Sequence, residues 1–177
     1  ENSTAAHLCE TTAALTPEAR ICKALKSLAG HRADAKIVAR CFQNLTPLCS
    51  DASGRACAHD HGVLPATLKA IRTHGSHAEA QRWGCALLAN ILDGKEEVDA
   101  LGMRQRAQLI DVVIQALSNH PDDEEVQSSG HHALQAVSRS EQELEQLKEE
   151  AARGAAARRA AAEAALSRQE SRAASSS

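Results

Sequence analysis

The chain has 177 residues and a formal net charge of −3, with 20 Lys and Arg residues against 23 Asp and Glu residues. This length allows one substantial core, and the balanced charge argues against a nucleic-acid partner, which needs a sustained basic field. No apolar run approaches the about 20 residues that cross a bilayer, so the sequence predicts no membrane span and a cytoplasmic chain. Abundant Ala, Leu, Gln, Glu and Arg with almost no aromatic residues predict an all-α fold of thin, similar layers.

The first clear helix start follows residues 1–15, at Thr16-Pro17-Glu18. A Thr side chain can cap free amides, Pro fits the first turn, and Glu suits the positive helix end. The same helix is expected to end near Gly30-His31. Ala5–Leu15 reads as the tail of a partial preceding repeat.

Helix ends are predicted again near His74-Gly75 and near Asn119-His120, and Pro121–Glu125 opens the next helix with an acidic first turn. Two shorter stretches, Ser53–His61 and Lys95–Arg106, are each expected to form a small leading helix. The glycines in and beside these stretches suit sharp turns; they are Gly54, Gly62, Gly94 and Gly102.

The sequence aligns with itself without a gap when it is shifted by 46 residues, and again when it is shifted by 43. The shift of 46 matches eight positions of the middle copy, Leu64, Leu68, Ile71, His74, Gln81, Gly84, Leu88 and Ile91, and the shift of 43 matches six of them, all except Gln81 and Gly84. Periods of about 40 to 47 residues with helical patterns are typical of HEAT and armadillo arrays. We therefore predict three copies, at residues 16–52, 53–94 and 95–139.

Three segments carry a family likeness: Gly62–Pro65, Glu79–Ile91 and Glu124–Val137. Over about residues 16 to 139 the chain resembles the armadillo (ARM) repeat family. The resemblance implies a right-handed superhelical α-solenoid of about three copies plus a partial N-terminal one. It also implies a non-enzymatic scaffold that binds a partner protein or peptide on a concave face.

In that family the third helices line the concave groove, and peptide-binding members carry a Trp four residues before an Asn. Here Asn90 has the Asn position, but Ala86 stands four residues before it. The equivalents of Asn90 are Pro47 and Ala136, so the ladder is absent and a groove for extended basic peptides is not expected. Partner contact is predicted instead from irregular side chains, with a solvated helical face as the alternative for each. These residues are Gln81, Arg82, Trp83, Asn90, Gln127, Ser128, His131 and Gln135.

Trp83 allows two interpretations. As a structural residue it covers the seam between copies, and as a hot spot it anchors a partner, a role in which Trp is enriched. We favour the structural interpretation, because the core has little other aromatic mass.

Histidine and cysteine residues are the candidates for a metal or catalytic site. Cys57, His59 and His61 have the elements of a zinc site, but alternate spacing is expected to spread them around a short helix, so no metal site or cofactor is predicted. His31, His74 and His120 share one repeat position at a helix end, where an imidazole can meet exposed carbonyl groups. The sequence lacks a phosphate-binding glycine loop, a His-Glu-x-x-His motif and a nucleophile elbow, so an enzyme is not predicted.

The six cysteines are interpreted as small apolar core residues in a reducing compartment, with a disulfide framework as the alternative. They are Cys9, Cys22, Cys41, Cys49, Cys57 and Cys85.

Residues 140–166 are predicted to form an Ala-rich C-terminal helix, which Ser140 caps. Leu144, Leu147 and Ala151 form a narrow stripe that can seal the open end of the solenoid. The rest of the helix is expected to be solvent-exposed or half of a coiled coil. Residues 167–177, rich in Ser and Arg, are predicted to be disordered.

Two functions from different classes follow from the sequence. The first is an interaction module that binds a partner on the groove. The alternative is a structural subunit or regulatory arm packed in a larger cytoskeletal, axonemal or signalling assembly. The sequence does not identify the partner or the oligomeric state.

Overall fold

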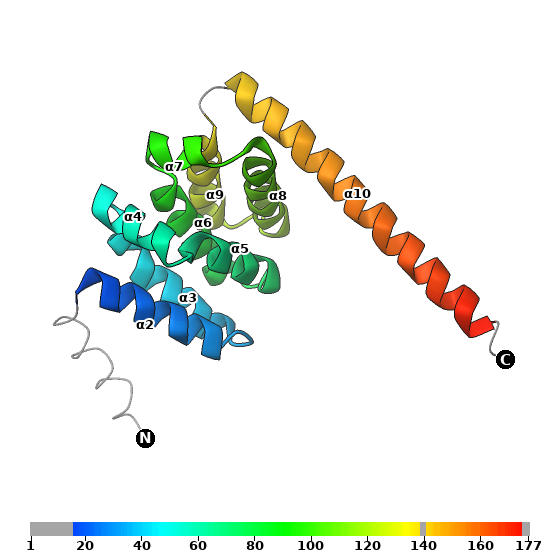
Figure 1. Ribbon diagram of the computed structural model, residues 1–177, viewed down its shortest axis with the longest axis horizontal. Helices are drawn as coiled ribbons and strands as arrows, with labels where there is room; N and C mark the ends of the chain where they lie inside the picture. The colour runs from blue at the N-terminus through cyan, green and yellow to red at the C-terminus, as the bar shows by residue number, and fades with distance from the viewer. Residues whose placement is uncertain (1–15, 139–140, 175–177) are drawn as a thin grey trace.

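The computed structural model describes residues 16–138 and 141–174, and within these ranges all regular structure is helical (Figure 1). The predicted all-α class is therefore confirmed. The segment 1–15, expected to be the tail of an earlier repeat, lies outside the described residues. The elements are α2 (Pro17–Gly30), α3 (Ala35–Leu45), the 3-10 helix η1 (Thr46–Cys49), α4 (Ala52–Asp60), α5 (Val63–Thr73), α6 (Ala78–Ile91), α7 (Lys95–Ala100), α8 (Met103–Asn119), α9 (Glu124–Val137) and α10 (Glu141–Ala174).

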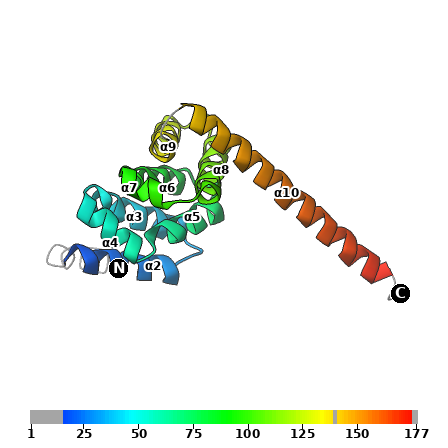
Figure 2. The same cartoon turned by 45° about the horizontal axis from the view of Figure 1, so that its top comes forward.

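The helices from α2 to α9 pair and then stack. α2 packs on α3, α5 on α6, and α8 on α9, while α6 lies between α3 and α9. Figure 2 shows α3, α6 and α9 at successive levels. The three pairs correspond to the three copies in the sequence, and α6 has the most extensive contacts because it has a copy on either side.

We call α3, α6 and α9 the third helices, and all three begin in the same way. Asp34 accepts hydrogen bonds from the amides of Lys36 and Ile37, and Asp123 accepts from those of Glu125 and Val126. His77 caps α6 in the middle copy, its Nδ1 accepting from the Ala80 amide. The three caps lie 43 and 46 positions apart, the two shifts found in the sequence. An acceptor at this point satisfies amides that the helix leaves free.

The middle helices, which are α2, α5 and α8, end near the predicted positions, and α2 also begins where the sequence predicted. Thr16 caps α2 by accepting from the Ala19 amide at 3.3 Å, and Pro17 occupies the first turn. α5 and α8 end at Thr73 and Asn119, each followed by one of the repeated histidines.

Those histidines connect successive copies. His74 Nε2 donates to the carbonyl oxygen of Arg32, and His120 Nε2 donates to that of Gly75, each at 2.8 Å. The expectation that each ring meets the carbonyl groups of its own helix end is thus corrected, because its acceptor lies in the loop of the preceding copy. Hydrogen bonds at equivalent positions tie the first copy to the second and the second to the third.

Two predictions about the short leading helices were wrong. The stretch expected to be one helix from Lys95 to Arg106 is divided at Leu101 and Gly102, where α7 has ended and α8 has not begun. Gly54 lies inside α4 rather than in a turn, and a Cβ there would overlap the carbonyl oxygen of Leu48. Gly62 does make a sharp turn, with φ of 68° before α5.

The long C-terminal helix α10 packs mainly on α8 and only slightly on α9. Leu147 and Ala151 are buried there, so the predicted apolar stripe does cover the last copy. Arg158 of α10 also pairs with Asp111 of α8 at 2.5 Å. Figure 1 shows the helix running on beyond the stacked pairs. The helix reaches Ala174, which corrects the disorder predicted from residue 167; residues 175–177 lie outside the described part.

Candidate partner-binding surface

The third helices present one row of side chains that the core does not absorb. Arg40 and Gln43 of α3 and His132 of α9 are exposed, while Trp83 and Ala86 of α6 and Ser129 of α9 are half-buried. Arg40, Trp83 and Ser129 share one repeat position, and Gln43, Ala86 and His132 share the next along the same face. We call these six residues the third-helix row.

Trp83 is the central residue of the third-helix row. Its ring packs against the core, and the Arg82 guanidinium carbon lies 5.0 Å from the ring centroid. Arg82 is in turn paired with Glu125 of α9. The indole N–H is buried with no hydrogen-bond acceptor among the described residues. The packing of the ring on the core and the burial of its N–H favour the structural interpretation, while the exposed part of the ring leaves a role in partner contact as a prediction.

Gln81 and Gln127, which the sequence suggested as groove residues, are structural. Gln81 is 1% exposed, and its amide donates to the carbonyl oxygens of Ile71 and His74 at 3.0 and 2.9 Å. Gln127 donates at 2.9 Å to the equivalent carbonyl oxygens of the next copy. Each glutamine joins the third helix to the end of the middle helix, so the groove interpretation is wrong for both.

Asn90 also has a structural contact. Its side-chain amide donates at 2.8 Å to the carbonyl oxygen of Thr46, in the preceding copy. A partner backbone would have to compete with this bond for the amide. The Asn90 amide is therefore already engaged within the stack.

Ser128, His131 and Gln135 are exposed, but they lie beside the third-helix row rather than on it. The residues equivalent to His131 in the first two copies are Phe42 and Cys85, both fully buried. These positions face the next copy in the stack, and α9 has no further copy against it within the described residues. Polar side chains there form a terminal face, as the last unit of a repeat array requires.

The sequence interpretation missed Arg40, Gln43 and His132. A signal was present, because these residues stand at the repeat positions of Trp83 and Ala86. Carrying the position of Trp83 into the other two copies gives Arg40 and Ser129, and carrying that of Ala86 gives Gln43 and His132. The hydrogen bonds of Gln81 and Gln127 to helix-end carbonyl groups, which the helical period does not reveal, then separate the two glutamines from the row.

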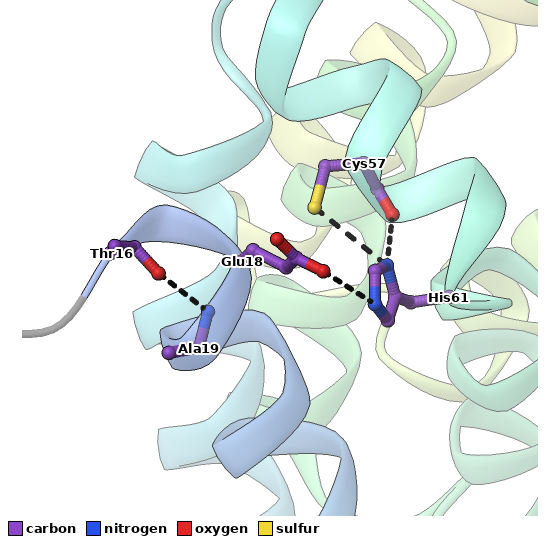
Figure 3. Close-up of polar contacts among 5 residues, drawn as sticks. All are labelled: Thr16, Glu18, Ala19, Cys57 and His61. Atoms are coloured by element: carbon purple, nitrogen blue, oxygen red, sulfur yellow. Dashed lines mark hydrogen bonds and ion pairs between the residues drawn. The ribbon is translucent and has the colours of Figure 1, made fainter.

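A second cluster lies where α2 meets α4, shown in Figure 3. His61 Nδ1 lies 3.7 Å from the Cys57 sulfur and 2.9 Å from the Cys57 carbonyl oxygen, and Nε2 lies 3.6 Å from a Glu18 oxygen. Cys57 and His61 share one face of α4, whereas the His59 side chain is 74% exposed beside Asp60. The sequence predicted that Cys57, His59 and His61 would spread around the helix. Only His59 points away, while Cys57 and His61 lie together.

This cluster lacks the electrostatics of an activated nucleophile. Burial raises the pKa of the Cys57 thiol, and the Glu18 carboxylate raises it further. A catalytic cysteine needs the opposite shift, toward thiolate at neutral pH. The Nδ1 that faces the sulfur is also positioned to donate to the Cys57 carbonyl.

The remaining cysteines in the described part of the chain confirm the core interpretation in part. Cys41, Cys49 and Cys85 are buried, and burial raises the pKa of the last two to about 11 and about 12. Cys22 and Cys57 are only half-buried. Cys9 lies outside the described residues.

Among the described residues there is no group of three or more His, Cys, Asp or Glu side chains arranged to hold a metal ion. No described helix is long and apolar enough to cross a membrane. Comparison of the chain with protein-family models, curated proteins and solved structures found no match.

Proposed function

We propose that the chain is an armadillo-type α-solenoid that binds a partner protein or peptide on the face formed by α3, α6 and α9. One observation carries this proposal: contacts at equivalent positions join successive copies, and the same register leaves the third-helix row outside the core. Stacked repeats of this kind create extended surfaces used for binding. The expectation that the chain is not an enzyme belongs to the same proposal.

Trp83 is the residue in this row best suited to anchor a partner. Its half-buried ring offers the only large aromatic surface of the row, and aromatic side chains are enriched at binding hot spots. Around it, Arg40, Gln43 and His132 supply the polar rim of such an interface. Recognition in this proposal uses these irregular side chains instead of an asparagine ladder.

The test uses a displayed peptide library selected on the full chain. Peptides that bind the third-helix row should lose affinity about tenfold or more when Trp83 becomes Ala, and less when Arg40 or His132 becomes Glu. His59→Glu, an exposed change on α4, is the control and should have no effect. If Trp83→Ala lowers the melting temperature and leaves every selected peptide bound as before, the hot-spot role of Trp83 is refuted. Binding unaffected by all three row variants would refute the row as a whole.

The alternative, a structural element in a larger assembly, is favoured by α10. This helix has 34 residues, and most described side chains from Ala152 onward are exposed. Removing residues 159–177 from the full chain distinguishes the two proposals. A structural element should then leave its native complex, whereas the binding of selected peptides to the repeats should persist.

A further inference from the structure

Two cavities occupy the same place in successive copies. The first lies between α2 and α5 and the second between α5 and α8. Every residue that lines the second stands 43 or 46 positions after a residue that lines the first. The volumes nevertheless differ, at about 220 Å³ for the first and about 90 Å³ for the second.

Side-chain size explains much of the difference. Ala66 lines the first cavity where Val112 lines the second. Thr73 is likewise replaced by Asn119, whose amide donates to the Gly75 carbonyl oxygen across the second interface. The second interface therefore shows that equivalent helices can pack with the smaller cavity, so the larger cavity between α2 and α5 is not a requirement of the stacking.

The polarity of the two cavities differs as well. Val38 lines the first cavity where Gln81 lines the second, so the first is walled mainly by aliphatic groups such as those of Leu25 and Ala70. Its size suits one large apolar side chain, or two small ones. Apolar concavity with a few polar groups at the edge is typical of binding pockets.

The edge of the first cavity is cationic. Arg32 and Lys69 line it, and the equivalent positions in the second cavity are the uncharged Gly75 and Gln115; the second cavity has one cation, Arg72, at the position where Ala29 lines the first. Lys69 and Thr73 also line an adjoining shallow groove between α5 and α8, which adds the exposed Arg72. None of the described residues that line this cavity and groove is acidic. The site thus combines an apolar pocket with a continuous positive border.

We propose that the α2–α5 pocket and its adjoining groove dock an acidic segment of a partner protein, which inserts one large apolar side chain between carboxylates. The three cations Arg32, Lys69 and Arg72 complement those carboxylates. This site lies on the middle helices and is separate from the third-helix row. It goes beyond the proposed function and does not depend on it.

A displayed library of random twelve-residue peptides tests this, selected on the full wild-type chain and counter-selected on Ala66→Leu, which fills the pocket. We expect enriched peptides to carry Leu, Ile, Met or Phe flanked by Asp or Glu. A synthetic peptide of the enriched sequence should bind Ala66→Leu at least tenfold more weakly than wild type. Lys69→Glu, an exposed change that does not threaten folding, should weaken it at least threefold. Gln115→Glu, the matched change in the second interface, should leave the affinity unchanged.

Three results would overturn the proposal. One is that no peptide separates wild type from Ala66→Leu. Another is that the enriched peptides are neutral or basic. The third is that Lys69→Glu and Gln115→Glu change the affinity equally. Because Trp83→Ala should not affect these peptides, the failure of one surface remains distinguishable from the failure of the other.

Discussion

The two interfaces between copies follow one plan and differ in how it is completed. Around the second cavity, Gln81 donates to the helix-end carbonyl groups of its own copy, Asn119 donates to the Gly75 carbonyl oxygen of the preceding copy, and Val112 fills the space between α5 and α8. Between the first and second copies, Val38 and Ala66 stand at two of these positions, and the space stays open and apolar. The repeat therefore determines where the helices lie, while a few side chains determine the volume left between them. We propose that the larger volume receives a partner.

The largest expected effect comes from removing the buried Gln81 amide, which lines the second cavity and ties α6 to the end of α5. Gln81→Leu should lower the free energy of unfolding by about 3 kcal/mol, because two carbonyl groups lose a buried donor. The comparison is Gln127→Leu, which removes the equivalent bonds at a half-buried position and should cost less, about 1 to 2 kcal/mol. Urea denaturation of both variants measures the difference. A loss below about 0.5 kcal/mol for Gln81→Leu would show that these bonds contribute little.

The next largest effect comes from enlarging the second cavity, between α5 and α8, by shortening one apolar side chain without removing a hydrogen bond. Val112→Ala places in the second interface the residue that the first one has, and Val112 is 1% exposed. We expect a loss of about 2 kcal/mol from the removed methyl groups and the cavity they leave. The same urea titration measures it. Unchanged stability would mean that the second interface collapses around the gap.

The reverse exchange should have a smaller effect of opposite sign. Ala66→Val adds methyl groups to the open pocket and should stabilise the chain by about 0.5 kcal/mol, the balance of apolar burial and a poorer helix former. The shift in the melting temperature measures this. A loss above about 1 kcal/mol would contradict the account, because it would show that the space near Ala66 is already filled.

The smallest effect is on thiol chemistry and needs no change in stability. Cys57, in the first interface region, is half-buried, whereas Cys85, between copies, is fully buried with its pKa raised to about 12. Alkylation requires thiolate, so a raised pKa slows it at neutral pH and the rate should rise with pH. We expect iodoacetamide to modify Cys57 in the native chain and Cys85 only after unfolding. Mass spectrometry of peptides after timed labelling measures this order, and equal rates would contradict it.

Much of the fold was predictable because the relevant signals are local. Thr16 before Pro17 and the acidic run before α9 gave helix starts that the structure confirms. The two self-alignments placed the copies, and the structure shows equivalent contacts at the same intervals. The end of α10 was misplaced, because its Ala-rich sequence forms helix as far as Ala174 in spite of the Ser and Arg residues that suggested disorder.

The candidate site was harder to predict because it depends on burial. Gln81 and Trp83 lie two positions apart in one helix, yet one is sealed in the core and the other belongs to the third-helix row. Ser128 was predicted as a groove residue, whereas the structure has it exposed on the terminal face of α9. The α2–α5 pocket could not be predicted at all, because it arises from the difference between Ala66 and Val112, a difference that does not disturb the repeat pattern.

Mapping a bound peptide by nuclear magnetic resonance tests the central comparison most directly. The measurement is the change in backbone amide shifts of the full chain when the library-selected acidic peptide is added. The account predicts that the largest changes lie on α2 and α5, around Leu25, Ala66 and Lys69, and that the equivalent positions Val112 and Gln115 change little. Equal changes at both interfaces, or changes confined to the second one, would contradict it.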